Sequence, residues 1–175
     1  MKLVVGLGNP GKEYENTRHN TGRIMVGLIE KKLDDEKIKF IMPDNFMNNS
    51  GKAVAPFIKT KKDLENLIVI YDDIDLPIGK MKISFNRSSG GHNGLGSIIK
   101  CLKSQEFLRI RIGISPETPS GKIRKPKGEK AVLNFILGEF KKDELEKLKK
   151  LSPKVAEAIK TIFSKGMGKA MSLYN

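Results

Sequence analysis

Two histidines are the residues of this sequence best suited to acid–base chemistry. His19 lies in the stretch TRHNTG and His92 lies in GGHNG, and each stretch precedes a segment with helical spacing of apolar residues. An imidazole with a pKa of about 6.5 can take a proton from water near neutral pH. Because a lone histidine is more often structural than catalytic, the polar residues around it must decide between the two roles.

Several carboxamides and one carboxylate lie in loops that follow predicted strands or precede predicted helices. They are Asn9, Asn20, Asn48, Asn49, Asp72 and Asn93. The carboxyl ends of the strands are where sites assemble in α/β sheets. We therefore expect several of these side chains to converge on one edge of the sheet.

Such a set of side chains suits proton transfer combined with hydrogen-bond recognition. A carboxylate such as Asp72 can orient His19 and stabilise its imidazolium, while carboxamides hold a carbonyl or a developing oxyanion. No serine or cysteine stands in a recognisable nucleophile setting, so attack by activated water is the simpler reaction. Two histidines among scattered acids lack the ligand spacing of a metal site, and we expect none. From spacing alone, an active site and a set of ordinary turn residues stay equally open.

The stretch VVGLGNPG contains the glycine pattern of a dinucleotide-binding loop, as Gly6, Gly8 and Gly11. Such a loop passes directly into a helix, whereas here Pro10 and then a mostly polar segment follow. The acid expected about 20 residues further on falls at Lys31. This context excludes a dinucleotide site, and we expect no cofactor.

The elements that must position these residues alternate between strands and helices. Strands are expected at residues 3–5, 38–42, 66–73, 79–85 and 107–114. Helices are expected at about 20–33, from 49 or 50, after 92, and from 141 to about 163, with Pro56 and Pro153 interrupting two of them. The order predicts one α/β domain over residues 1–175, a three-layer sandwich whose twisted, mixed but mostly parallel sheet is flanked by helices.

The net charge favours a polyanionic partner. Lysine and arginine number 33 against 20 acidic residues, a balance of +13, which points to nucleic acid first and an anionic membrane second. A basic protein without such a partner is the competing interpretation. Residues 115–130 hold three prolines, two glycines and five basic residues and predict a mobile basic loop, either a solvated linker or a phosphate-binding arm. Residues 141–175 are expected to form C-terminal helices.

The single cysteine, Cys101, cannot form an internal disulfide, and its apolar helical surroundings predict a small buried residue. The N-terminal stretch MKLVVGLG has too few apolar residues for a signal peptide, and no apolar run approaches the length of a membrane span. We expect a cytoplasmic protein that has no membrane partner.

Five motifs in this order resemble the bacterial-type peptidyl-tRNA hydrolase family. They are VVGLGNPGKEYENTRHNTG, NFMNNSGKAV, VIYDDIDLPIG, GGHNGLGSII and FLRIRIGI, and the likeness runs from Lys2 to about Gly113. The resemblance implies an enzyme that cleaves the ester between a peptide and the 3′ ribose of tRNA, with peptidyl-tRNA as partner. It implies His19 as the general base, Asp72 as the group that stabilises its protonated state, and Asn9 as the side chain that distinguishes N-blocked substrates.

The resemblance also implies a set of substrate contacts. They are Tyr14, Phe46, Met47, Asn48 and Asn93. For the tRNA phosphates, the basic residues Arg111, Lys82 and Arg109 are candidates near the cleft. Alternation along the last strand puts Arg109 on the same face as Arg111, so at least one of the two is expected to reach phosphate. His92 matches a motif residue without a catalytic role, and Asp73 and Asp75 are expected to shape a turn or face solvent. We take a monomer as the default.

Three departures from the family pattern concern tRNA binding and the sheet. The segment 34–44 is shorter than usual, which predicts a missing or shortened edge strand. Gly96 and Ser84 stand where the family carries lysines, and the basic residues of 122–130 are a candidate for compensation. A non-catalytic tRNA- or RNA-binding protein on the same scaffold, and a hydrolase of another ester, remain alternatives.

Overall fold

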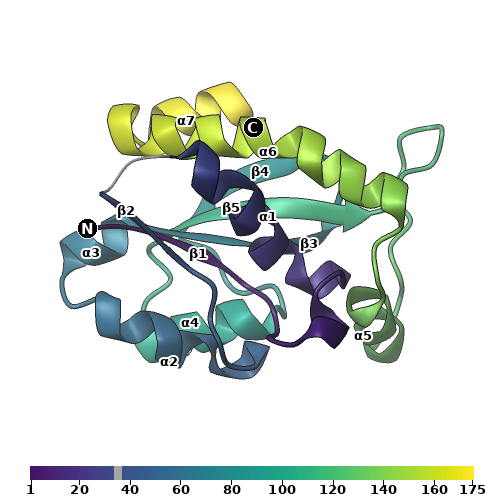
Figure 1. The fold of residues 1–175 in the computed structure, drawn as a ribbon, viewed down its shortest axis with the longest axis horizontal. Helices are drawn as coiled ribbons and strands as arrows, with labels where there is room; N and C mark the ends of the chain where they lie inside the picture. The colour runs from purple at the N-terminus through teal and green to yellow at the C-terminus, as the bar shows by residue number, and fades with distance from the viewer. Residues whose placement is uncertain (34–36) are drawn as a thin grey trace.

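Among residues 1–33 and 37–175, which the computed structural model describes, five strands form one sheet in the order β2-β1-β3-β5-β4 (Figure 1). The strands are β1 (Lys2–Gly6), β2 (Ile38–Ile41), β3 (Leu67–Pro77), β4 (Met81–Phe85) and β5 (Leu108–Ser115). All neighbouring pairs are parallel except β4 with β5. The predicted mixed, mostly parallel sheet is confirmed.

Helices cover both faces of this sheet and make the predicted three layers (Figure 1). They are α1 (Thr21–Ile29), α2 (Ser50–Val54), α3 (Lys61–Glu65), α4 (Asn93–Leu102), α5 (Glu129–Leu137), α6 (Lys142–Lys165) and α7 (Met167–Tyr174). In Figure 1, α1, α6 and α7 lie on one side of the sheet, and α2 and α4 lie on the other.

The central strand β3 explains why the sheet is buried on both faces. Ile68 and Ile70 belong to the core beneath α1 and α6, whereas Val69 and Tyr71 belong to the core beneath α2 and α4. All four side chains are buried. A strand covered on both faces needs an unbroken apolar run, which is the pattern NLIVIY.

β3 is longer than the sequence predicts. Its pairing with β1 ends at Gly6 and Ile70, but β5 continues to pair with it and carries it on to Pro77. Asp72 therefore lies inside β3 rather than at its end. It nevertheless lies beyond the last pair with β1, at the carboxyl edge of that strand, where a site was expected.

Pro153 does not divide the C-terminal helix, contrary to the sequence prediction. α6 runs through it from Lys142 to Lys165. Proline leaves the carbonyl four residues earlier without its helical donor, but the Ser152 hydroxyl donates to that Lys149 carbonyl oxygen at 2.8 Å. The expectation for Pro56 is confirmed, because α2 ends at Val54 and the proline lies in the 3-10 turn that follows.

Two further expectations concern the periphery. Cys101 is exposed, not buried, because α4 buries residues only in its first two turns and the cysteine lies in the last. The edge strand β2 has four residues, and residues 34–36 of the shortened segment 34–44 lie outside the described residues. The loop 115–130 contains an antiparallel bridge between Glu117 and Ile123; its mobility stays a prediction.

A close approach between α1 and the end of β1 sets the position of the loop that precedes α1. The backbone N–H of Arg23 donates to the Leu7 carbonyl oxygen at 3.1 Å. A Cβ on Gly22 would lie closer than 3.0 Å to backbone atoms of Leu7 and Ile70, so only glycine fits there. Gly27, on the exposed side of the same helix, has open space around it.

We expect Gly22→Ala to lower the free energy of unfolding by about 1–3 kcal/mol, because the methyl group must push two backbone segments apart. The matched change Gly27→Ala should instead raise it by about 0.4–1 kcal/mol, since alanine has less freedom to lose in a helix. Urea unfolding of both variants measures the two effects. Equal effects at the two positions would contradict the close approach.

Candidate active site

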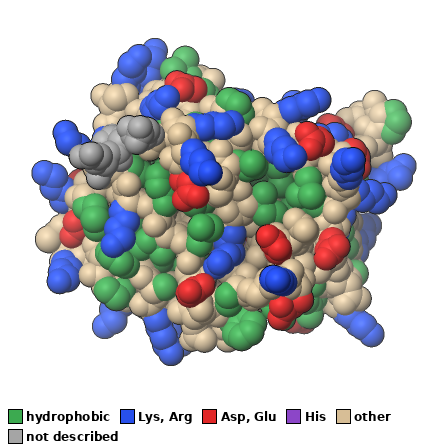
Figure 2. All heavy atoms as spheres, viewed as in Figure 1, with side chains coloured by type: hydrophobic (Ala, Val, Ile, Leu, Met, Phe, Trp, Pro, Cys, Tyr) green, Lys and Arg blue, Asp and Glu red, His purple; other side chains and the backbone are tan. Residues whose placement is uncertain are grey.

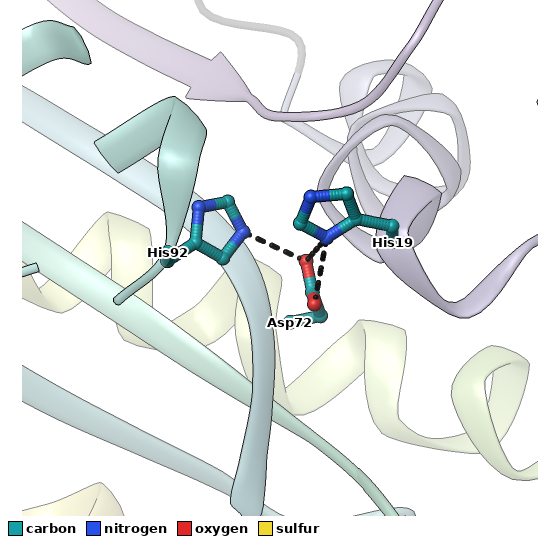
Figure 3. A group of neighbouring side chains, drawn as sticks. All are labelled: His19, Asp72 and His92. Carbon is teal, nitrogen blue, oxygen red and sulfur yellow. Dashed lines mark hydrogen bonds and ion pairs between the residues drawn. The ribbon is translucent and has the colours of Figure 1, made fainter. Parts of the chain in front are cut away.

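His19 and Asp72 form a buried hydrogen-bonded pair (Figure 3). His19 lies in the 3-10 turn Arg18–Asn20 immediately before α1, and Asp72 comes from β3. The Nδ1 atom of His19 is 3.0 and 3.1 Å from the two carboxylate oxygens, and each residue is 5% exposed. With its proton on Nδ1, the ring keeps a lone pair on Nε2, which has no hydrogen-bond partner among the described residues. This is the arrangement of a general base.

His92 approaches the same carboxylate from the opposite side (Figure 3). Its Nε2 lies 2.9 Å from Asp72 Oδ1, and its Nδ1 accepts the Leu95 N–H at 3.2 Å as the N-cap of α4. Because Nδ1 accepts, the proton must lie on Nε2 and be donated to Asp72. The sequence interpretation left His92 out of the site. The sequence did contain a signal for placing His92 in the site, because GGHNG stands directly before a predicted helix.

The two ring contacts decide the charge of Asp72. Burial by itself would raise the pKa of this carboxyl group, but the charges and hydrogen bonds of His19 and His92 outweigh it and hold the pKa well below its usual range. For His19, burial lowers the pKa, yet the charge of Asp72 and its hydrogen bond raise the pKa above the ordinary value of 6.5. Asp72 is thus an anion throughout the range in which His19 titrates.

The same three side chains offer possible metal ligands. Their ligand atoms, one from each of His19, Asp72 and His92, lie within 4.8 Å of one another. The sequence interpretation excluded a metal on spacing, because it could not foresee this convergence. Both ring nitrogens are at hydrogen-bond distance from the carboxylate, so protons satisfy all three groups. The absence of a metal site stays a prediction.

Asn9, in the glycine-rich turn, is tied to Asn20, the residue that follows His19. Asn20 holds its backbone on both sides, accepting the Asn9 N–H at 2.8 Å and donating to the Asn9 carbonyl oxygen at 2.9 Å. The side-chain Oδ1 of Asn9 accepts the Met47 N–H at 2.8 Å. Its Nδ2 has no partner among the described residues and is free to donate to a ligand. Asn20, one of the carboxamides expected at this edge of the sheet, therefore fixes the position of Asn9.

The predicted substrate contacts come from three separate segments. Met47 is buried and packs against Gly94 at the start of α4, next to the exposed Asn93. Phe46 is 56% exposed, and its ring meets that of Tyr14 edge-on with centroids 6.2 Å apart.

Asn48, which follows Met47 in the same 3-10 turn, is exposed too. These side chains thus offer two aromatic rings and two amides at the surface, and a thioether in the packed wall beneath it.

Of the two arginines on β5, only one reaches the site. Arg111 Nε lies 2.5 Å from Asp73 Oδ2, and its Nη1 lies 3.4 Å from Ser84 Oγ. Arg109 is fully buried and donates to the carbonyl oxygens of Ser88 and Gln105. The sheet alternation puts both on one face, as expected, but the loop carrying Ser88 covers Arg109, which is therefore not available to phosphate.

A cavity of about 400 Å³ lies against the pair of His19 and Asp72, whereas Asn9 lines a second hollow together with Asn20. The lining of the first cavity includes His19, Asp72, His92, Arg111, Val132 and Ile136. Lys125 of the basic loop lines it as well and pairs with Asp75 of β3. Asp73 and Asp75 bind these basic side chains, and the expected turn and solvent roles hold as well, because Asp73 Oδ1 accepts the Asp75 N–H at 2.7 Å and Asp75 is exposed.

Comparison with known proteins identifies the family. Residues 3–175 match the family model described as peptidyl-tRNA hydrolase. This chain belongs to the peptidyl-tRNA hydrolase family. The peptidyl-tRNA hydrolase of Thermoanaerobacter sp. (strain X514) is 40% identical over 194 aligned positions, and that of Listeria welshimeri is 38% identical, each alignment covering 100% of both chains.

A crystal structure of peptidyl-tRNA hydrolase from Acinetobacter baumannii superposes with a TM-score of 0.82 at 27% identity, over 100% of this chain and 94% of that one. The α/β fold is thus that of peptidyl-tRNA hydrolases. The alignment with the Thermoanaerobacter relative is longer than the 175 residues of this chain, so this chain carries gaps against it. In the part of the chain that the structure describes, no helix combines the length and the apolar character needed to cross a bilayer.

We expect Asp72→Asn to lower the pKa of His19, because the imidazolium loses the negative charge that raises it while the amide oxygen can still accept from Nδ1. NMR titration of the His19 ring measures this without any substrate. The control is Asp75→Asn, an exposed change on the same strand, which should leave the titration of His19 where it is. An unmoved His19 titration in Asp72→Asn would remove Asp72 from this role.

Proposed function

We propose that this chain hydrolyses the ester that links an N-blocked peptide to the 3′ ribose of tRNA, and so recycles tRNA from stalled or prematurely released peptidyl-tRNA. The observation that carries the proposal is the buried pair of His19 and Asp72, with Nε2 of the ring unpartnered, in a chain of the peptidyl-tRNA hydrolase family. Asn9, held by the residue that follows His19, has a free amide donor.

In the proposed reaction, water attacks the ester carbonyl carbon while His19 Nε2 takes its proton. Asp72 accepts the hydrogen bond from Nδ1 and stabilises the imidazolium that forms. The tetrahedral intermediate then collapses, the bond between the acyl carbon and the ribose 3′ oxygen breaks, and the imidazolium returns its proton to that oxygen. Peptide acid and free tRNA leave, and His19 is again neutral.

The commitment of Asn9 Oδ1 to Met47 gives a reason for selectivity toward blocked substrates. Only Nδ2 is left for a ligand, so Asn9 presents a donor and no acceptor. A donor can bind the carbonyl oxygen of an N-acyl group. The ammonium of a free aminoacyl end is itself a donor and cannot accept this hydrogen bond. Asn9 therefore favours peptidyl-tRNA over aminoacyl-tRNA.

The surface around the site suits the end of a tRNA. Single-stranded bases stack on aromatic rings, and Tyr14 and Phe46 supply two of them next to the amides of Asn48 and Asn93. The net charge of +13 favours the phosphates. Lysine and arginine side chains lie all round the outline of the face in Figure 2.

The proposal extends to the parts of the surface where this chain departs from the family pattern. Arg111 is held by Asp73 but lines the cavity, and the exposed Lys82 is its register partner on β4. The basic loop brings Lys125 to the same cavity. We propose that this loop compensates for the lysines that Gly96 and Ser84 replace. We also propose that the enzyme acts as a cytoplasmic monomer, since one cysteine suits a reducing compartment and the site is built from a single chain.

We expect the chain to release the blocked amino acid from N-acetylaminoacyl-tRNA and to leave unblocked aminoacyl-tRNA intact. His19→Ala should lower kcat by about 10²–10⁴-fold, because the general base is lost. The rate of the wild type should rise with pH as His19 deprotonates, with the midpoint above 6.5 since its pKa is raised. Tight tRNA binding without any cleavage would identify a non-catalytic tRNA-binding protein instead.

Neutralising Lys122, Arg124, Lys125 and Lys127 together to glutamine should raise KM several-fold at low salt and leave kcat within about twofold, because four contacts with phosphate are weakened. The difference from wild type should shrink as salt screens the charges.

The matched control removes the same charge from exposed lysines of α6 and α7, which do not belong to the loop, namely Lys150, Lys154, Lys165 and Lys169. Its KM should stay within about twofold of wild type. Equal changes in the two variants would assign the effect to net charge and not to the loop.

A further inference from the structure

Arg18, the residue before the catalytic histidine, holds a charge inside the protein. Its side chain is 12% exposed, and its Nη2 lies 3.1 Å from Oε2 of Glu144, whose side chain is 11% exposed. The Arg18 Nη1 donates to the Phe135 carbonyl oxygen at 3.5 Å, and its Nε is buried without a partner. Replacing a buried ion pair by apolar residues is often neutral or stabilising, so stability alone does not account for this one.

The guanidinium also approaches two aromatic rings. Its Cζ is 4.6 Å from the ring centre of Phe135, in α5, and 5.6 Å from that of Phe140, in the segment between α5 and α6. A cation over an aromatic face is attracted to it, more strongly where water is excluded. Gly138 completes the enclosure, since a Cβ there would lie 3.0 Å from Arg18 Nη1. α5 and the chain after it are thus packed around this one side chain.

Backbone hydrogen bonds join the same two segments. The Arg18 N–H donates to the Gly138 carbonyl oxygen at 3.0 Å, the Phe140 N–H donates to the Asn16 carbonyl oxygen at 2.9 Å, and Thr17 and Glu139 form an isolated antiparallel bridge. Residues 16–18 and 138–140 are therefore in register. His19 follows directly, so any shift between the segments is passed to its ring.

Glu144 is fixed independently of Arg18. Its Oε2 accepts the Lys141 N–H at 2.7 Å in the capping box that begins α6. At the other end, α5 supplies Val132 and Ile136 to the wall of the cavity that contains His19. Arg18 thus connects three parts of the molecule, which are the start of α6, the α5 wall and the catalytic turn.

We propose that Arg18 is a positioning residue, whose buried ion pair with Glu144 holds the turn carrying His19 in register with the α5 wall of the cavity. The inference rests on the proposed function in taking His19 as the base. Arginine is required because its planar fork contacts a carboxylate, a carbonyl and two rings at once, which the point charge of a lysine does not.

The test is Arg18→Lys, which keeps the charge next to His19 and removes the fork. We expect kcat on N-acetylaminoacyl-tRNA to fall by about 10–100-fold, because a displaced base is poorly aligned with the attacked carbonyl. We also expect the pKa of His19, measured by NMR in the free enzyme, to fall as the Nδ1 contact with Asp72 weakens.

The ionisable groups that face this ring are Asp72 from β3 and His92 at the N-cap of α4, and both are unchanged in the variant. Since residue 18 keeps its charge, a shift in the titration reports a change of geometry.

Glu144→Gln is the second variant, because glutamine can still accept the Lys141 N–H and so preserves the cap. It should lower kcat and the pKa of His19, as Arg18→Lys does. Adding Arg18→Lys to it should lower kcat by a smaller factor than Arg18→Lys does in the wild type. The matched control is Glu157→Gln, which breaks the exposed pair with Lys160 on the same helix and should change neither quantity.

A lower melting temperature with unchanged kcat per folded molecule and unchanged His19 titration, in either variant, would overturn the proposal and leave Arg18 a structural residue. Because the titration needs no substrate, it stays decisive even if His19→Ala keeps its activity. Full activity of His19→Ala would contradict the proposed function and leave the positioning role of Arg18 untouched.

Discussion

The buried carboxylate of Asp72 is the constraint on which the site depends. A carboxylate taken out of water must be given donors, or it gains a proton and becomes neutral. Here the donors are two imidazoles from distant parts of the chain, His19 before α1 and His92 before α4. The bond to Asp72 sets the tautomer of both rings. The ring of His19 is thereby left with its lone pair on the side away from Asp72.

Asn9 follows the same logic with neutral groups. Asn20 fixes its backbone, Met47 occupies its oxygen, and only its amide nitrogen is left without a partner. At both His19 and Asn9, hydrogen bonds to the protein occupy one end of the side chain, so the other end is available in one chemical form. The two free ends differ in kind, since His19 Nε2 is a hydrogen-bond acceptor and Asn9 Nδ2 is a hydrogen-bond donor.

The acids of YDDID create an electrostatic problem for a protein that binds a polyanion, and each is matched with a basic partner. Asp72 lies between the two histidines, Asp73 pairs with Arg111 and Asp75 pairs with Lys125. The negative charge along this part of β3 is thus compensated before a phosphate approaches. The pair of Asp75 with Lys125 also ties the basic loop to the strand that carries Asp72.

The pair of His19 with Asp72 was expected from the family resemblance and from the meeting of strand ends at one edge of the sheet. Local patterns in the sequence determined the strands and most of the helices, because apolar periodicity, glycine turns and short motifs are properties of neighbouring residues. Patterns of that kind do not contain the pairing of residues far apart in the chain. The contact of His92 with Asp72, the burial of Arg109, the length of β3 and the pair of Arg18 with Glu144 each depend on which segments pack together. At Pro153 the packed structure overrides a local pattern, because the Ser152 hydroxyl and the buried face of α6 outweigh the helix-breaking effect of proline. The sequence by itself determined which residues are able to react, and only the tertiary structure decided which of their atoms are occupied and which are free, because hydrogen bonds between distant segments exist only once the chain is packed.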